Sequence, residues 1–292
     1  MPARKLLVIF CRLSWVTYVA LIVVALSGRL PFGLGWIWVP AAVAIALTLE
    51  MSRQARARHA VRPPAVEVAA PVTGRWTALN SPADKVPSHG THSLGQTYAV
   101  DIVAEPEPGG RPAFAWLWPV VRRNRAFPAF GEPLLAVADG TVVHATDRQR
   151  DHLSRTSLPA LVYMTLIEAA VRELSGAGWI TGNQLVLDLG DGTYAMYAHL
   201  QRGSLAVRPG DRVRAGQVLA RCGNSGNSTE PHVHFQLMDH ADLDLARGIP
   251  FRWHGIGVPA NGDPFLAGEQ TGEQAGEQTE GRTAGEGPTA LG

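Results

Sequence analysis

The sequence predicts a mainly β domain, built as an antiparallel sheet or sandwich with one helical insertion, that follows a transmembrane helical hairpin. Two long apolar runs fill the first fifty residues, which indicates the hairpin. Short runs of strand-forming residues between turns rich in Gly, Asp, Asn and Pro fill the middle of the chain, which indicates the sheet. With 292 residues, of which 46% are hydrophobic, the chain can bury one substantial domain beside these accessory segments.

The membrane hairpin is predicted over residues 1–52, with spans at about 6–27 and 30–50. The first run is interrupted by Arg12 alone, and the second is uncharged as far as Leu49. Each run has about the 20 apolar residues that a helix needs to cross a bilayer, and the glycines and prolines between them suit a tight connection. A cleaved signal peptide is the alternative for the first run, because a basic pair precedes it and small residues suited to cleavage end it.

The basic residues around the hairpin indicate a side of the membrane for the domain. Arg29 is the single charge in the connecting loop, whereas basic residues flank both ends of the hairpin. The flanking residues are Arg4, Lys5, Arg53, Arg56, Arg58 and Arg62. The positive-inside rule therefore favours both ends, and the domain that follows, on the cytoplasmic side.

Two segments of different composition border the folded domain, which is expected over 81–266. Residues 53–80 are rich in Ala, Arg, Pro and Val and are predicted to form a juxtamembrane linker. Residues 267–292 repeat Gly-Glu-Gln with almost nothing apolar to bury, so we expect a disordered tail. The two cysteines, Cys11 and Cys222, provide neither a disulfide framework nor a Cys-rich zinc site. Any metal must therefore be bound by histidine and carboxylate.

Within the domain, four short runs between turn-forming stretches predict antiparallel strands. They are residues 185–189, 194–199, 213–219 and 232–237. Residues 158–174 differ, because their apolar side chains recur at helical spacing and predict a helix inserted between strands, ending near Ser175 and Gly176. The residues at helical spacing are Tyr163, Leu166, Ile167, Ala170 and Leu174.

Two histidines stand on the last predicted strand. His232 and His234 are two positions apart, so with a rise of about 3.3 Å per residue their side chains share one face, roughly 7 Å apart. A catalytic zinc takes three His or carboxylate ligands and leaves a fourth position for the water that attacks a peptide carbonyl. A base and an oxyanion donor complete such a site, and His199 is a candidate for one of these roles.

Six ordered blocks, between about residues 88 and 239, resemble the M23 zinc metallopeptidases, also called LytM or lysostaphin-like endopeptidases. The blocks are residues 92–101, 131–143, 182–192, 197–200, 207–219 and 223–237. A lone His-x-His motif would be weak support, whereas six blocks in the family's order are specific. The resemblance implies a LytM-like peptidase fold, one zinc ion per domain, and cleavage of peptide cross-links in bacterial peptidoglycan.

The resemblance also implies a role for each motif residue. His92, Asp101 and His234 match the three zinc ligands of the family. His199 and His232 match the unligated pair beside the metal, of which one assists deprotonation of the water and the other stabilises the tetrahedral intermediate. The family pattern leaves open which histidine has which role.

His89 competes with His92 for the first ligand position. In many members of the family the aspartate follows the first histidine by four positions, whereas Asp101 follows His92 by nine. That spacing resembles a longer form of the motif, which ends in Tyr-Ala-x-Asp, and it favours His92.

These observations predict a membrane-tethered zinc endopeptidase of the bacterial cell membrane that acts on peptidoglycan. One alternative is a catalytically inactive M23-fold module that binds a partner, although all five motif positions are present. The other is a peptidase that processes a non-wall peptide, because the arginines that favour a cytoplasmic domain conflict with a substrate in the wall. The net charge of +1 gives no electrostatic reason to expect nucleic-acid binding.

Overall fold

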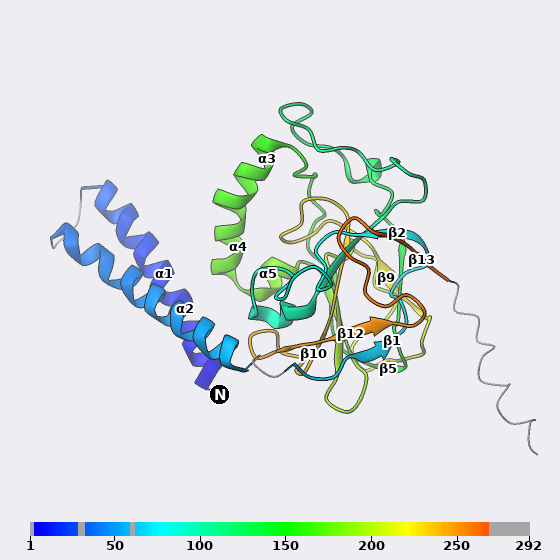
Figure 1. Cartoon of the computed structure of the whole chain (residues 1–292). Coiled ribbons are helices and arrows are strands. Elements are labelled where there is room, and N and C mark those ends of the chain that lie inside the picture. The colour runs from blue at the N-terminus through cyan, green and yellow to red at the C-terminus, as the bar shows by residue number, and fades with distance from the viewer. Residues whose placement is uncertain (1–2, 29–32, 59–61, 269–292) are drawn as a thin grey trace, which may run out of the picture.

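The computed structural model describes residues 3–28, 33–58 and 62–268, which form a helical hairpin beside a β-rich domain (Figure 1). The hairpin consists of α1 (Ala3–Leu26), a 3-10 turn (Leu34–Ile37) and α2 (Trp38–Arg58). Each helix is long and apolar enough to cross a bilayer, and most of its surface is exposed. The first helix agrees in position with the predicted span 6–27, whereas the second apolar helix begins later than the predicted span 30–50 and continues to Arg58.

Small residues bring the two hairpin helices together. Ala41 and Ala44 of α2 and Cys11 of α1 are buried where the two helices are in contact. The Cys11 thiol lies 3.7 Å from the carbonyl oxygen of Ala44 and 3.4 Å from the hydroxyl of Thr48. Small side chains let two helix backbones approach closely, which is the usual way that apolar helices pair in lipid.

A nine-stranded sheet forms the body of the domain, and neighbouring strands in it pair antiparallel. Its strand order is β13-β2-β3-β10-β7-β6-β5-β8, and β11 pairs with the end of β10. The strands are β2 (Gly74–Ala78), β3 (Val100–Ala104), β5 (Gly140–Thr146), β6 (Gln184–Asp188), β7 (Tyr194–Ala198), β8 (Arg212–Val213), β10 (Val233–Met238), β11 (Gly248–Ile249) and β13 (Pro264–Ala267). The predicted mainly β, antiparallel class is therefore confirmed.

Two smaller sheets complete the β structure. β1 (Val66–Val68) pairs parallel with β12 (Phe251–Trp253), and β4 (Pro133–Leu135) pairs antiparallel with β9 (Val218–Arg221). Their buried residues join those of the large sheet in one hydrophobic core. The two small sheets therefore cover one face of the large sheet.

Side chains along β10 alternate between the two faces of the sheet, and this alternation determines which of them lie outside the main core. Val233, Phe235 and Leu237 of β10 are buried in the main core. Because successive strand residues point to opposite faces, His234 and Gln236 project from the other face. A smaller cluster around Met196 and Met238 covers only part of that face.

The predicted helical insertion is present and ends close to where the sequence predicts. It runs through α3 (Leu158–Tyr163), a π-helical turn (Met164–Glu168) and α4 (Ala169–Ser175). Ser157 caps its start by accepting a hydrogen bond from the backbone N–H of Ala160, and Gly176, with φ of 108°, ends it. A short helix, α5 (Ala177–Thr181), follows.

The boundaries of the folded domain differ from those expected. β1 and β2 lie inside residues 53–80, the predicted linker, and α2 extends into it as far as Arg58. Composition missed these strands because each is three to five residues long and is stabilised by pairing with distant partners, β12 for β1 and both β3 and β13 for β2. β13 ends at Ala267, and most of the predicted tail, 269–292, lies outside the described residues.

Candidate metal centre

Strand pairing brings the first two candidate ligands together. β10 lies between β3 and β7, and His234 stands directly opposite Asp101 in the antiparallel pair with β3. Residues opposite each other in such a pair project from the same face with Cβ atoms about 5 Å apart. The Nδ1 atom of His234 accordingly lies 2.9 Å from Oδ1 of Asp101.

His89, from the loop before β3, supplies the third member of the group. Its Nε2 atom lies 2.9 Å from Oδ2 of Asp101, and its ring centroid is 4.9 Å from that of His234. One nitrogen of each histidine and one oxygen of Asp101 all lie within 4.8 Å of one another. His234 and Asp101 are buried and His89 is nearly so, which shields the group from bulk water.

Hydrogen bonds with neighbouring residues determine which ring nitrogens of His89 and His234 face Asp101. The Ser88 hydroxyl donates to the carbonyl oxygen of Ala99, so it accepts from Nδ1–H of His89 and leaves Nε2 with a lone pair. Nε2–H of His234 donates to Oε1 of Gln236, which leaves Nδ1 with a lone pair. Both lone pairs face the carboxylate of Asp101.

The donor set therefore fits a bound cation. Two imidazole lone pairs and a carboxylate, all acceptors, converge at hydrogen-bonding distance, and a positive ion between them would relieve their repulsion. Two histidines and one carboxylate are typical ligands of a catalytic zinc, and outer hydrogen bonds that orient them are typical of its surroundings. Asn80 supplies a further outer contact, donating to Oδ2 of Asp101 at 2.8 Å.

His92, the ligand that the sequence favoured, is not in this group. Its Nδ1 atom lies 3.1 Å from the hydroxyl of Thr97, at the start of the 3-10 segment Ser93–Tyr98. Ser88 instead bonds to the backbone of Thr97 and Ala99, which holds the neighbouring His89 beside β3. Sequence spacing favoured His92. Spacing alone does not show how the loop that carries His89 folds back against β3.

The other two motif histidines do lie beside the group. The ring centroids of His199 and His232 are 4.7 Å apart, and that of His199 is 5.8 Å from that of His234. Nδ1–H of His199 donates to the carbonyl oxygen of Ser225, and Nδ1–H of His232 donates to that of Glu230, both at 2.8 Å. In each ring Nε2 is therefore the atom left to exchange a proton.

His199 is held in a strained backbone conformation. It directly follows β7 and has φ of 60°, in the left-handed region that residues other than glycine seldom adopt. Its backbone N–H donates to Thr181, and its carbonyl oxygen accepts from Gly223. Strain of this kind persists where the surrounding structure determines it, and it is concentrated at functional sites.

Burial and mutual proximity shift the pKa values of the cluster. Burial is the largest single effect on the pKa of Asp101, and it acts to raise that pKa. The charges of His89 and His232, together with contacts to His232 and His234, outweigh burial and bring the pKa of Asp101 well below its usual range. Burial, assisted by His232 and His234, brings the pKa of His199 well below its usual value. For His232, the lowering of the pKa by burial is outweighed by the charge of Asp101, so its pKa is raised.

Close backbone contacts fix the loop that precedes β10. A Cβ atom on Gly182 would meet the backbone of Ser225 at 2.5 Å, and one on Gly226 would meet Gly182 at 2.4 Å. A partly buried ion pair connects the same region to the long loop after β3, because Arg111 donates two hydrogen bonds of 2.9 Å to the carboxylate of Glu230. The carbonyl that orients His232 is thereby anchored from a distant part of the chain.

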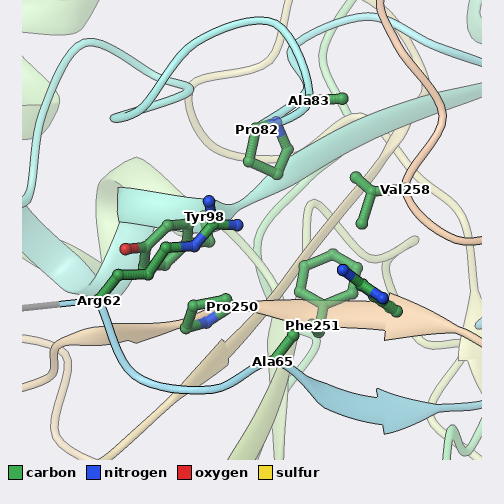
Figure 2. Close-up of a pocket in the computed structure, with 9 residues that line it drawn as sticks. Arg62, Ala65, Pro82, Ala83, Tyr98, Pro250, Phe251 and Val258 are labelled. Carbon is green, nitrogen blue, oxygen red and sulfur yellow. The ribbon is translucent and has the colours of Figure 1, made fainter.

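A cavity of about 250 Å³ lies elsewhere on the domain (Figure 2). It is lined by the segment after the hairpin, the loop around Pro82 and strand β12, and the guanidinium of Arg62 stacks 5.3 Å above the ring of Tyr98. None of the five clustered residues lines it. The cavity is therefore separate from the cluster of candidate residues.

Comparisons with known proteins agree with the motif order. Residues 125–244, which include His199, His232 and His234, match the profile of peptidase family M23. The glycyl-glycine endopeptidase ALE-1 of Staphylococcus capitis is 42% identical over 69 residues, or 22% of this chain and 18% of that protein. The peptidoglycan DD-endopeptidase ShyA of Vibrio cholerae is 30% identical over 77 residues, or 24% of this chain and 17% of that protein. The aligned residues thus span less than a fifth of either relative.

A solved structure is also similar. The catalytic domain of lysostaphin from Staphylococcus simulans, crystallised in the absence of phosphate, is 21% identical and has a TM-score of 0.32. The comparison covers 60% of this chain and 88% of that domain.

Proposed function

We propose that the chain is a membrane-tethered, zinc-dependent endopeptidase of peptidase family M23 that cleaves peptide cross-links of peptidoglycan. The convergence of His89, Asp101 and His234 with the unligated pair His199 and His232 carries the proposal. A family member that had become a binding module would not need to retain both sets. The inactive alternative therefore has no support among these five residues.

His89, Asp101 and His234 would hold the zinc, through the atoms Nε2, Oδ1 or Oδ2, and Nδ1 respectively. The ion, when bound, supplies a Lewis acid that polarises the scissile carbonyl and lowers the pKa of a water molecule. Ser88, Gln236 and Asn80 keep these ligand atoms directed inwards. We propose His89 in place of His92 as the first ligand for this reason.

His199 and His232 would carry the protons. Each offers Nε2 to the site, because each commits Nδ1–H to a backbone carbonyl. Nε2 of one ring, which is neutral, accepts the proton of the attacking water and passes it to the leaving amine, and Nε2–H of the other ring, which is protonated at both nitrogens, donates to the oxygen of the carbonyl as charge develops on it. The loop carbonyls of Ser225 and Glu230 thus accept from Nδ1–H of each ring and leave Nε2 directed to the site.

The activities of two relatives support the proposed substrate class. ALE-1 is a glycyl-glycine endopeptidase and ShyA a peptidoglycan DD-endopeptidase, which supports a wall peptide as substrate without choosing between these bonds. α1 and α2 would anchor the enzyme in the bacterial cell membrane as two spans, with the domain beside the bilayer.

A second candidate, a peptidase for a non-wall peptide at the membrane, is favoured by the basic residues that flank the hairpin. Arg53 and Arg56 near the end of α2, together with Lys5 in α1, favour the cytoplasmic side for the domain. A wall substrate requires the opposite side. A topology reporter fused after Gly292 distinguishes the two candidates, because its activity depends on the compartment that it reaches.

The enzyme itself is tested with the purified full chain in lipid nanodiscs. We expect release of free amines from peptidoglycan, abolished by a chelator, restored by zinc, and absent from the His199→Ala variant. A folded, zinc-loaded chain that cleaves neither peptidoglycan nor peptides would refute the proposal.

A further inference from the structure

The helical insertion, residues 158–175, has its polarity reversed relative to a helix on the surface of a water-soluble domain. Nine of its positions between 158 and 171 are exposed, and none of the nine carries a charge. They are Leu158, Pro159, Val162, Tyr163, Thr165, Leu166, Ile167, Ala170 and Val171. Leu166 is 67% exposed and Val171 58%. A surface helix in water normally shows the opposite pattern, with its apolar stripe towards the core.

Two of the three charged residues of this helix, Glu168 and Arg172, face the domain, whereas Glu173, close to its C-terminal end, is exposed. Glu168 accepts two hydrogen bonds from Arg155, at 2.8 and 2.9 Å, and lies 3.6 Å from Arg172. The side chains of Arg155, Glu168 and Arg172 are only 12 to 16% exposed. The helix is therefore held to the domain by ion pairs, and its apolar side chains are exposed on the outside of the part of the chain that the structure describes.

A second apolar segment lies next to the helix. Residues 114–121 expose three aromatic rings, with Trp116 75% and Trp118 83% exposed. Backbone hydrogen bonds join Ala115 to Thr156 and Leu158, and the Ser157 hydroxyl donates to the carbonyl of Val120. We call the exposed residues of 114–121 and of 158–171 together the apolar flank. Apolar patches of this kind on soluble domains mark a contact surface.

The apolar flank adjoins the membrane hairpin. Figure 1 shows α3 and α4 on the side of the domain that faces α1 and α2, and the lower end of α4 contacts α1. Arg12 of α1 lies beside Gly176, where the helix ends, and pairs with Asp244 at 2.9 Å. Lys5 pairs with Asp242, so the basic side chains of Lys5 and Arg12 both face the domain.

We propose that the apolar flank is a second lipid contact, by which the catalytic domain rests in the surface of the bilayer beside its hairpin. This inference rests on the membrane anchoring proposed above. The hairpin brings the flank to the bilayer, and Trp and Tyr side chains are those enriched at the membrane interface. Three basic residues that suit anionic lipid headgroups directly follow residues 114–121: Arg122, Arg123 and Arg125.

The proposal changes how the enzyme is held. If the apolar flank did not contact lipid, the domain would be connected to the hairpin by the segment after α2 and by the two ion pairs of Lys5 and Arg12. With the flank in the lipid, the domain is fixed at one height and one orientation. Its reach is then limited to peptides close to the membrane surface.

Single-cysteine labelling of the full chain in vesicles of phosphatidylethanolamine and phosphatidylglycerol tests this. Cys11 and Cys222 are buried, so a polarity-sensitive fluorophore is directed to an introduced cysteine. Leu166→Cys and Trp118→Cys report on the flank, and Leu266→Cys, at a site 73% exposed on β13, is the matched control. We expect a blue-shifted emission and quenching by nitroxide-labelled lipids at both flank sites and neither at Leu266.

Each of the other possible results would overturn either the lipid contact or the anchoring. Flank sites that match the Leu266 control, in a chain that still floats with the vesicles, overturn the lipid contact and leave the anchoring intact. A blue shift without lipid quenching also overturns it, because protein, such as a second copy, then covers the flank. A chain that does not float with the vesicles overturns the anchoring itself and, with it, this inference.

Discussion

His234 stands directly opposite Asp101 across the β10–β3 pair, and its Nδ1 atom lies 2.9 Å from the carboxylate. Backbone pairing, which is set by hydrogen bonds along two buried strands, thus positions two of the three residues of the candidate metal centre. The remaining candidate ligand, His89, comes from the loop before β3.

Replacing His89 by alanine should remove the zinc. Its Nε2 atom is one of three that converge at the centre, so we expect the purified His89→Ala chain to retain well under one zinc per molecule. His92→Ala is the matched control, since His92 bonds to Thr97 outside the cluster, and it should retain about one. Metal content by mass spectrometry decides, and the reverse result would restore His92 as the ligand.

The two histidines of the His-x-His motif should respond differently to substitution. His234→Ala loses a ligand, so zinc and activity fall together. His232→Ala should retain most of the zinc while hydrolysis slows by roughly 10²–10⁴-fold, the usual contribution of a proton-transferring residue. Parallel assays of bound zinc and of amine release check this. Equal loss of zinc in both variants would contradict the separate roles.

The ion pair beneath the apolar helix should make stability depend on acid pH. Burial would raise the pKa of Glu168 most strongly, yet the hydrogen bonds and charge of Arg155, with the charge of Arg172, lower it below the ordinary 4.5. A carboxylate with a lowered folded-state pKa stabilises the fold fully above the unfolded value and progressively less as the pH falls through the folded value. Thermal unfolding of the wild type should therefore lose this contribution below about pH 4.5.

Glu168→Gln provides the comparison for that prediction. The amide cannot ionise, so the variant should be less stable than the wild type at pH 7, and the difference between them should shrink as the pH falls. A difference that stays constant between pH 7 and pH 3 would show that the carboxylate charge contributes nothing.

Gly182→Ala should destabilise the domain. The new Cβ atom would lie 2.5 Å from the backbone of Ser225, and the residue has φ of 67°. Overpacking of this kind costs roughly 1–3 kcal/mol, and strain at positive φ adds to it. Gly178→Ala, four residues earlier with no atom within 4 Å, is the control and should leave the melting temperature unchanged or slightly higher. A comparable Tm for both variants would mean that the loop adjusts at no cost.

Several features of the fold follow directly from the sequence pattern. The alternation in 232–237 predicted a strand with both His232 and His234 directed to one side, and the helical spacing in 158–174 predicted the insertion. These signals are local, because a side chain's neighbours two to four positions away determine them. The same is true of the two apolar hairpin helices.

Other features depend on contacts between distant residues. The choice between His89 and His92 is made by hydrogen bonds of Ser88 to the backbone near β3, and nothing in the spacing shows them. β2 is recognisable only through its partners β3 and β13. Helical periodicity identified the stripe that includes Leu166 but could not show that this stripe faces outwards, because both orientations have the same pattern.

The position of β10 has a consequence for biosynthesis. Although it lies in the middle of the sheet, between β3 and β7, it is among the later strands to leave the ribosome. Asp101 and His89 emerge more than 100 residues before His234, the residue that completes their cluster. A partly synthesised chain consequently has its anchor and two ligands but no hydrolytic centre. Any peptidase activity of this protein begins only after nearly the whole folded domain has been translated.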